Sequence, residues 1–450
     1  MAKTIIIGAG FAGIGAARFL AANKIDSIVF EKRQNPEGNL YASYKMNFDD
    51  SSHIVSTKNE QFAKLFNNAS DKTEAVTEHL NIRHFFKGHN IMHPPLQNLH
   101  KLPKSLIIKI VNEISELKTS REKLACNLKQ WLYANFGETY TESLLEKLIQ
   151  KTYTLSSEKI DFSDMKNEFH RSSFGDILLG ALTEETPHPN DGFKVDYPLK
   201  GDFLQFLTRA KSEVQIKFGY TVKSIDLKEK IVFFENGEKE SYSFLISSMP
   251  LPDLIECIKG IPDKIKFPTE KLAWTSCVIV DIAIKRKLAS NVHCAFFYDS
   301  DIIFSQLIFR QTFSGRNTQE NYETIQAHIH FSEKYRPLHL PPNSFIGPVI
   351  NNLKRCDIID DNDKIVCQSS RKLTYANIIH DFNRRANLSA IHKKLDELNI
   401  FYCGRYGLWN NMKADESFES GENAAKKVKN LFNSMTDIRI TPKNFGSLFV

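Results

Sequence analysis

Residues 4–31 of the chain read TIIIGAGFAGIGAARFLAANKIDSIVFE. The β-branched run at 4–7 is typical of a buried parallel strand. A Gly-x-Gly-x-x-Gly loop follows, then an alanine-rich helical stretch, and a second apolar run at 27–30 ends at Glu31. This order of strand, tight loop, helix and strand predicts an α/β fold with a Rossmann-type parallel sheet.

Each glycine of this loop has a physical role in binding a dinucleotide. Gly8 permits the tight turn out of the strand, Gly10 lets the backbone approach a pyrophosphate, and Gly13 lets the helix pack close to the sheet. The helix N-terminus offers free N–H groups to the phosphates. Glu31 follows Gly13 by 18 residues, near the spacing of about 20 at which an acid binds ribose hydroxyls. The loop therefore predicts a dinucleotide site, and it does not distinguish NAD from FAD.

The composition is that of a folded protein and narrows the functional classes. The 450 residues are 42% apolar and 25% charged, which excludes disorder across the whole chain. No apolar run approaches the roughly 20 residues of a membrane span. A net charge of +6, from 59 basic and 53 acidic residues, is compatible with an anionic small-molecule ligand. No basic stripe interleaved with aromatic residues indicates nucleic acid.

The seven cysteines are widely spaced and include no Cys-x-x-Cys pair. This pattern favours neither a zinc site nor a disulfide framework, so we expect no metal and a reducing, cytoplasmic location.

The chain after the fingerprint changes periodicity several times. Helical spacing is predicted at 60–80 and from 104 to 150. Strands are predicted at 214–218 and 221–225, and a hairpin over 231–247 with Asn236-Gly237 as its turn.

Alternating strands are predicted in the second half of the chain, at 274–284 and 292–332. A Pro- and Asn-rich connection follows at 336–352, and a polar tail at 433–450. We expect four polar residues of the alternating region to face solvent or to pack rather than to catalyse. These are Arg310, Tyr322, His328 and His330.

Three stretches of sequence together resemble one enzyme superfamily. They are IIIGAGFAGIGAA at 5–17, FLISSMPLP at 244–252, and YCGRYGLW at 402–409 with DESFESG at 415–421. In this order they resemble the FAD-dependent amine-oxidase superfamily, and within it the branch of protoporphyrinogen-oxidase-like and UDP-galactopyranose-mutase-like proteins. The likeness runs over most of the chain.

The resemblance implies a discontinuous FAD-binding domain and a second, mixed α+β substrate domain, with the active site in the cleft between them. The FAD domain would comprise 1–90, 200–260 and 400–432. The substrate domain would comprise 91–199, which is helical, and 261–399, and 433–450 would be an accessory tail. Together the fingerprint and the resemblance predict cofactor contacts at Gly8, Gly10, Phe11, Ala12, Gly13, Glu31, Lys32, Asn39, Val222, Gly404, Arg405, Asp415, Ser417 and Phe418.

The chain departs from the superfamily pattern where glycines would approach the flavin. Glu37 begins Glu-Gly-Asn where the family has Gly-Gly-Asn, and Ser51 and Ser52 precede His53 where it has a glycine-containing pair. The stretch PLKG at 198–201 stands where the family has Pro-x-Gly-Gly. These changes imply weaker flavin contact. His53 is either a flavin neighbour or a buried structural histidine, and Arg405 is either a ligand contact with a planar fork or half of a surface ion pair.

The substrate side departs further from the mutase-like proteins. Gln306 stands where the resemblance places a substrate-binding arginine, and Asn411 and Lys413 stand where it places Tyr and Asp. Arg310, four residues after Gln306, could compensate in part on the same strand face. The substrate-binding candidates are Gln306, Arg310, Trp409 and Asn411, and the catalytic candidates are His53 and Arg310.

These patterns lead us to expect an FAD-dependent oxidoreductase that acts on a small polar metabolite, with a nucleotide-linked sugar as one candidate. Three alternatives stay open. They are a catalytically degenerate protein that binds flavin or nucleotide within a complex, a nicotinamide-dependent dehydrogenase, and a mutase-like flavoenzyme. We expect the FAD to be non-covalent, since no cysteine lies in a recognisable attachment context.

Overall fold

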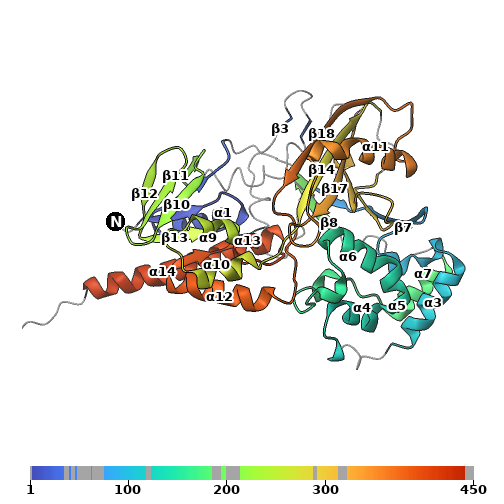
Figure 1. Ribbon diagram of the computed structural model, residues 1–450, viewed down its shortest axis with the longest axis horizontal. Coiled ribbons are helices and arrows are strands. Elements are labelled where there is room, and N and C mark those ends of the chain that lie inside the picture. The colour runs from blue at the N-terminus through green and yellow to red at the C-terminus, as the bar shows by residue number, and fades with distance from the viewer. Residues whose placement is uncertain are drawn as a thin grey trace, which may run out of the picture.

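The computed structural model contains two large β-sheets and three small ones, with a group of helices beside the second large sheet (Figure 1). It describes residues 3–34, 40–41, 46–47, 62, 75–117, 123–184, 194–198, 213–286, 291–312 and 322–440.

The first sheet is parallel throughout and contains the fingerprint strand at its centre. Its strand order is β19 (Ile400–Tyr402), β13 (Phe244–Ser247), β1 (Thr4–Ile7), β2 (Ser27–Glu31) and β9 (Ile216–Phe218). Alternate residues of these strands belong to two separate apolar clusters, one on each face. Both faces are therefore covered, as expected of parallel strands, and the predicted Rossmann-type α/β class is confirmed.

Helices cover both faces of this sheet. On one face lie α1 (Phe11–Ala22) and α14 (Ala414–Ile440). On the other lie α9 (Leu251–Cys257), α10 (Asp263–Glu270), α12 (Arg384–Glu397) and a small antiparallel sheet. The strands of that small sheet are β10 (Val222–Asp226), β11 (Ile231–Phe234) and β12 (Lys239–Ser241).

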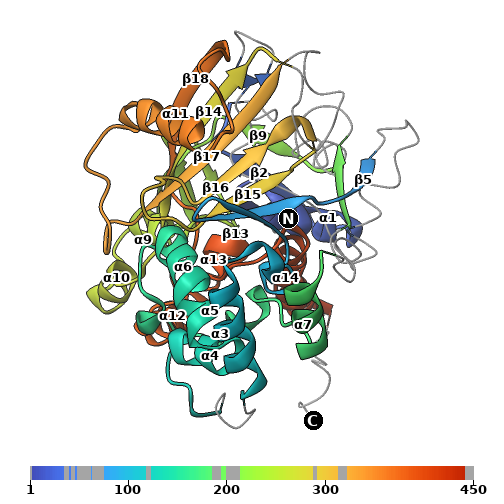
Figure 2. The same ribbon diagram turned by 90° about the vertical axis from the view of Figure 1, so that its right-hand side faces the viewer.

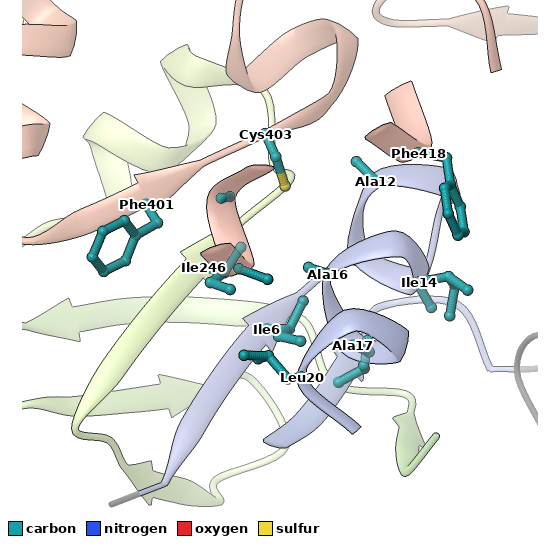
Figure 3. Close-up of a cluster of buried hydrophobic side chains, with 14 of the residues drawn as sticks. Ile6, Ala12, Ile14, Ala16, Ala17, Leu20, Ile246, Phe401, Cys403 and Phe418 are labelled. Carbon is teal, nitrogen blue, oxygen red and sulfur yellow. The ribbon is translucent and has the colours of Figure 1, made fainter. Parts of the chain in front are cut away.

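The contact between α1 and α14 brings main chain against main chain (Figure 3). A Cβ added at Gly15 would lie 2.3 Å from the carbonyl oxygen of Phe418, and one added at Gly421 would lie 1.8 Å from that of Ala12. No side chain fits at either position, so the two helices depend on these glycines for their approach.

The second sheet has seven strands and is antiparallel except where β15 pairs with β6. Its order is β18 (Ile365–Leu373), β14 (Ser276–Ile284), β17 (Glu323–Phe331), β16 (Gln306–Phe309), β15 (Cys294–Phe297), β6 (Ile82–Phe86) and β7 (His89–Met92). One face forms an apolar cluster with α11 (Ile346–Arg355), and the other reaches the core of the first sheet through β15 and β16 (Figure 2). Two interior strands, β14 and β17, are buried at every residue.

The helical group lies beside β6 and β7 and has its own apolar cluster around Trp131. Its helices are α3 (Lys104–Ser115), α4 (Leu128–Phe136), α5 (Glu138–Tyr140), α6 (Glu146–Tyr153) and α7 (Phe174–Leu182), which bears out the helical spacing of 104–150. Short helical turns connect the elements at Pro95–Gln97, Leu99–Lys101, Thr141–Leu145, Ser157–Lys159, Lys166–Glu168, Arg310–Thr312 and Pro342–Phe345. Two small sheets pair β3 (Leu40–Tyr41) with β4 (Met46–Asn47), and β5 (Ala75–His79) with β8 (Lys194–Pro198).

Several local expectations from the sequence are wrong. The end of the helix predicted at 60–80 is strand β5, and the connection predicted at 336–352 contains the start of α11. The hairpin predicted over 231–247 ends at β12, because the apolar run of β13 pairs with β1 instead. The tail predicted from 433 is a continuation of α14 to Ile440.

Two of the alternating strands predicted in the second half, β14 and β17, are buried at every residue, so His328 and His330 pack rather than face solvent. All seven cysteines are free thiols. Within the described part of the chain, no helix is long and apolar enough to cross a membrane, and no group of three or more His, Cys, Asp or Glu is arranged to hold a metal ion.

We predict that Gly421→Ala lowers the free energy of unfolding by about 3 kcal/mol, because the new methyl group would overlap the backbone of α1. Gly347→Ala is the control, since its helical site in α11 has no atom within 4 Å. The control should be neutral or stabilising by up to about 1 kcal/mol. Urea unfolding monitored by circular dichroism measures both, and equal stability of the two variants would contradict the proposed helix contact.

Candidate functional site

The carboxyl ends of the parallel strands gather residues from three distant segments at one edge. Gly8 follows β1, Ser248 follows β13, and Gly404 follows β19. Ser248 binds the end of β1, since both its main-chain N and its Oγ donate to the Ile7 carbonyl, at 2.9 and 2.8 Å. Open parallel sheets bind their ligands at this edge, and we describe it as the candidate site.

The three fingerprint glycines differ in what the fold requires of them. Gly8 has φ +96°, and an added Cβ would lie 2.2 Å from the Oγ of Ser248. At Gly13 an added Cβ would lie 1.8 Å from the carbonyl oxygen of Gly8. Gly10, the N-cap of α1, has no atom of the described residues within 4 Å of such a Cβ. The protein itself therefore needs Gly8 and Gly13, whereas Gly10 leaves open space before the helix N-terminus.

The Glu31 carboxylate lies directly beside the glycine loop. Its Oε2 accepts a hydrogen bond from the Ala9 main-chain N at 2.8 Å, and its Oε1 accepts one from the Arg33 main-chain N at 3.0 Å. The acid is thus held at the end of β2 next to the start of α1. This is the arrangement in which an acid binds ribose hydroxyls.

The segment after β19 closes against the start of α1. Gly404 has φ +78°, and an added Cβ would lie 3.0 Å from the Cβ of Ala12 and 3.6 Å from the Oγ of Ser417. The Gly404 main-chain N donates to the Oγ of Ser420 at 2.8 Å. The N-terminal ends of α1 and α14 therefore lie together, and both carry the positive end of a helix dipole.

Arg405 projects from this segment and has no acidic partner at ion-pair distance among the described residues. Its Nη2 donates to the Oδ1 of Asn377 at 3.1 Å and to that of Asn411 at 2.8 Å. Its Nε is buried without a hydrogen-bond partner. The cation is thus oriented by two neutral amides and keeps an unused donor.

Glu168 approaches the same cation from the helical group. Its Oε2 accepts a hydrogen bond from the Tyr153 hydroxyl at 2.7 Å. Removal of water by the surrounding protein raises the pKa of Glu168, and Tyr153, Arg405 and Asn411 oppose that rise. Tyr153 and Glu168 therefore form a hydrogen-bonded pair near Arg405, whose own partners are Asn377 and Asn411.

The face of the second sheet that reaches the first sheet carries a cross-strand row of polar and aromatic residues. The row consists of Arg371, Ile279, His328, Gln306, Phe296 and His84. Gln306 donates from its Nε2 to the Sγ of Cys294 at 2.7 Å. Arg310 lies beyond the end of β16, is buried, and interacts with the carboxylate of Asp281. It therefore does not continue the strand face of Gln306, as the sequence had suggested.

A buried arginine holds the 404–411 segment to the rest of the protein. Arg384 of α12 donates from Nε and Nη2 to the Trp409 carbonyl, at 3.0 and 2.6 Å, and from Nη1 to Asp164 at 2.8 Å. Since Asp164 belongs to the helical group, this side chain joins three segments around the site.

The structure brings most of the predicted cofactor residues to this edge. Gly8, Gly10, Phe11, Ala12, Gly13, Glu31, Gly404, Arg405, Asp415, Ser417 and Phe418 all come from the strand ends and helix starts described above. Lys32 is exposed next to Glu31, and Val222 is buried at the start of β10 in the opposite cluster. Asn39 and His53 lie outside the described residues. The roles of all these residues stay predictions.

Two of the predicted contacts have little side-chain surface to offer a ligand. Phe418 is buried against Phe62, with ring centroids 5.5 Å apart, and Trp409 is completely buried beside Trp274. Both side chains pack in the core.

Sequence reasoning missed Glu168 and Tyr153, the hydrogen-bonded pair near Arg405. Tyr153 ends α6 at a position that reads as ordinary helix, and Glu168 lies in a single short turn. Neither position has a motif or a periodicity that could have identified it.

Comparison with known proteins supports the Rossmann-type assignment of the first segment and shows which known structures share the fold. Residues 6–69 match a family model described as an NAD(P)-binding Rossmann-like domain. A reduced UDP-galactopyranose mutase superimposes with a TM-score of 0.87 at 18% identity, over 96% of each chain. A proposed protoporphyrinogen oxidase from Exiguobacterium sp. 255-15 gives 0.73 at 11% identity, over 96% of this chain and 99% of that one. A fatty acid isomerase from P. acnes gives 0.62 at 10% identity, over 95% and 98%.

The chain is thus a two-sheet α/β protein with a Rossmann-type dinucleotide-binding segment. Its fold is the one shared by the mutase and the oxidase, so the resemblance inferred from the sequence is confirmed at the level of fold.

We predict that Arg384→Met lowers the free energy of unfolding by about 3 kcal/mol, because it leaves the buried Trp409 carbonyl without its donors. The neighbouring Arg385→Met serves as a control. Its side chain is 62% exposed and lies 3.5 Å from Asp161, so it should cost less than about 1 kcal/mol. Chemical unfolding compares the two, and a loss of similar size in both would argue against the bracing role of Arg384.

Proposed function

We propose that this chain binds FAD non-covalently at the carboxyl edge of its parallel sheet and acts as a flavin-dependent oxidoreductase on a small polar metabolite. The observation that carries the proposal is Gly10. The fold does not need a glycine there, and the open space lies before a helix N-terminus with Glu31 beside it. A pyrophosphate that approaches the backbone does need one.

The residues present fit such a cofactor. The start of α1 would hold the pyrophosphate through its free N–H groups, and Glu31 would accept hydrogen bonds from ribose hydroxyls. The N-terminus of α14 adds a second positive helix end near Gly404, where it stabilises negative charge. A bound flavin would supply electron and hydride transfer.

The motif order of the sequence favours FAD over NAD, because it resembles that of a flavin-dependent superfamily. The discriminating experiment is an absorption spectrum of the purified protein with mass spectrometry of the released ligand. A yellow protein that dithionite bleaches and that releases FAD supports the proposal. A colourless protein that binds NAD(H) supports the nicotinamide-dependent alternative. If the protein is yellow but neither NAD(P)H nor a candidate substrate reduces its flavin, the result supports a flavin-binding protein without enzymatic activity.

We predict that Gly10→Val abolishes flavin binding and changes the free energy of unfolding by less than about 1 kcal/mol. The new side chain meets no protein atom within 4 Å at its Cβ, but it fills the space that a pyrophosphate would need. Flavin content per folded protein is the measurement, and Gly347→Ala should keep the wild-type content. Wild-type flavin content in Gly10→Val would overturn the assignment of this loop.

The mutase-like alternative is favoured by the fold but not by the substrate-side residues. The resemblance places an arginine at position 306, where this chain has an amide that hydrogen-bonds Cys294. A charge-assisted contact to a phosphate contributes about 1.5–3 kcal/mol, and a neutral amide does not replace it.

We therefore predict no interconversion of UDP-galactofuranose and UDP-galactopyranose by the dithionite-reduced protein. Chromatography of the reaction mixture measures conversion, with an active mutase as the positive control. Turnover of even a few per second would show that the substrate-side alignment is mistaken.

A further inference from the structure

A pocket of about 650 Å³ lies between α6 and the second sheet. Its walls come from α6, from the loop between β15 and β16, and from the loop after β17 (Figure 1). A volume of this size is typical of small-molecule sites. None of its lining residues belongs to the candidate site described above, so the pocket is a separate feature of the molecule.

Three residues of α6 face this pocket. Lys147, Gln150 and Lys151 have the i, i+3, i+4 spacing of one helix face. Tyr153 of the same helix instead donates its hydroxyl to Glu168 of the candidate site. The pocket and the candidate site therefore use different faces of α6.

The pocket gathers positive charges that the protein itself does not neutralise. Lys147, Lys151 and Arg336 all line it, and none of them has an acid at ion-pair distance among the described residues. The one acid in the lining, Asp301, is paired with Arg355 at 2.5 Å. Cations gathered in a concave site attract an anionic ligand.

Lys151 is held in position at the wall of the pocket. Its Nζ donates to the carbonyl oxygens of Phe297 and Asp299, at 3.0 and 2.9 Å. Both acceptors are neutral, so the hydrogen bonds orient the ammonium group without cancelling its charge. An ammonium group has three donors, which leaves one for a ligand.

We propose that this pocket is a second binding site, for a small molecule that carries a phosphate group. The three cations and one acid of the lining leave two positive charges, and a phosphate monoester carries nearly two negative charges at pH 7. The hydroxyls of Ser156 and Ser300 can donate to phosphate oxygens, while Leu155 and Ile302 offer apolar contact to the rest of the molecule. The proposal does not depend on flavin binding.

The first test measures the binding of phenyl phosphate and of benzoate to the full-length protein by isothermal titration calorimetry. We expect phenyl phosphate to bind with a dissociation constant below about 1 mM. Benzoate carries one negative charge instead of two and should bind at least about fivefold more weakly. A wild-type dissociation constant above about 1 mM for phenyl phosphate, or equal affinity for both compounds, would overturn the proposal.

Four variants locate the binding. Lys147→Met and Arg336→Met should each weaken phenyl phosphate binding by about fivefold or more, and neither side chain hydrogen-bonds to another described residue that its loss would leave unpaired. Lys109→Met removes an exposed cation of α3, and Arg405→Gln removes the cation of the candidate site. Both should stay within about twofold of wild type. A loss in either of these two that equals the loss in the pocket variants would overturn the assignment to this pocket.

The pH dependence of binding provides an independent measurement. Removal of water lowers the pKa of Lys151 to about 8, and Arg336 lowers it further, while Asp299, Asp301 and Cys356 oppose this shift. The positive charge of Lys151 is thus lost as the pH rises through this value, whereas a phosphate monoester, with a second pKa of about 6, stays dianionic. Wild-type affinity for phenyl phosphate should therefore fall between about pH 7 and pH 9, and that of Lys151→Met should change less. Identical pH profiles in the two proteins would overturn the proposal.

Discussion

The main-chain contact between α1 and α14 is the constraint on which the rest of the structure depends. It joins the first helix of the chain to the last described one, and it exists only because Gly15 and Gly421 have no side chains. Once these helices touch, β19 is placed beside β13, and Gly404 meets Ala12 at the start of α1. The candidate site thus arises first from close backbone packing, to which Ser248 and Ser420 add hydrogen bonds.

The polar groups around the site then act mainly to orient one another. Arg384 is satisfied by a carbonyl and by Asp164, and Arg371 pairs with the buried Asp281. Buried charges are costly unless they are paired and hydrogen-bonded, so these pairs fix segments rather than offer charge to a ligand. Arg405 differs, because amides orient it and one of its donors stays unused.

The sequence was sufficient to predict the first βαβ unit because every signal there is local. The strand, the glycine spacing, the helix and Glu31 lie within 28 consecutive residues, and each follows from short-range geometry. The pairing of β13 with β1 is not local, so the apolar run at 244–247 was assigned to a hairpin. The burial of β14 and β17 on both faces likewise depends on what packs against them. Glu168 was missed for the same reason, since its partner Tyr153 comes from α6.

The two sides of the candidate site are held by different interactions. The fold therefore constrains the dinucleotide side more strongly than the substrate side. The dinucleotide side is set by backbone packing at Gly8, Gly13 and Gly15, where any substitution strains the fold. The opposite side is set by side-chain hydrogen bonds, which a single residue can change without unfolding the protein. A fold shared with a mutase, an oxidase and an isomerase is therefore compatible with different substrates on one cofactor platform. Where such folds differ in chemistry, the difference lies in side chains and not in the shared backbone.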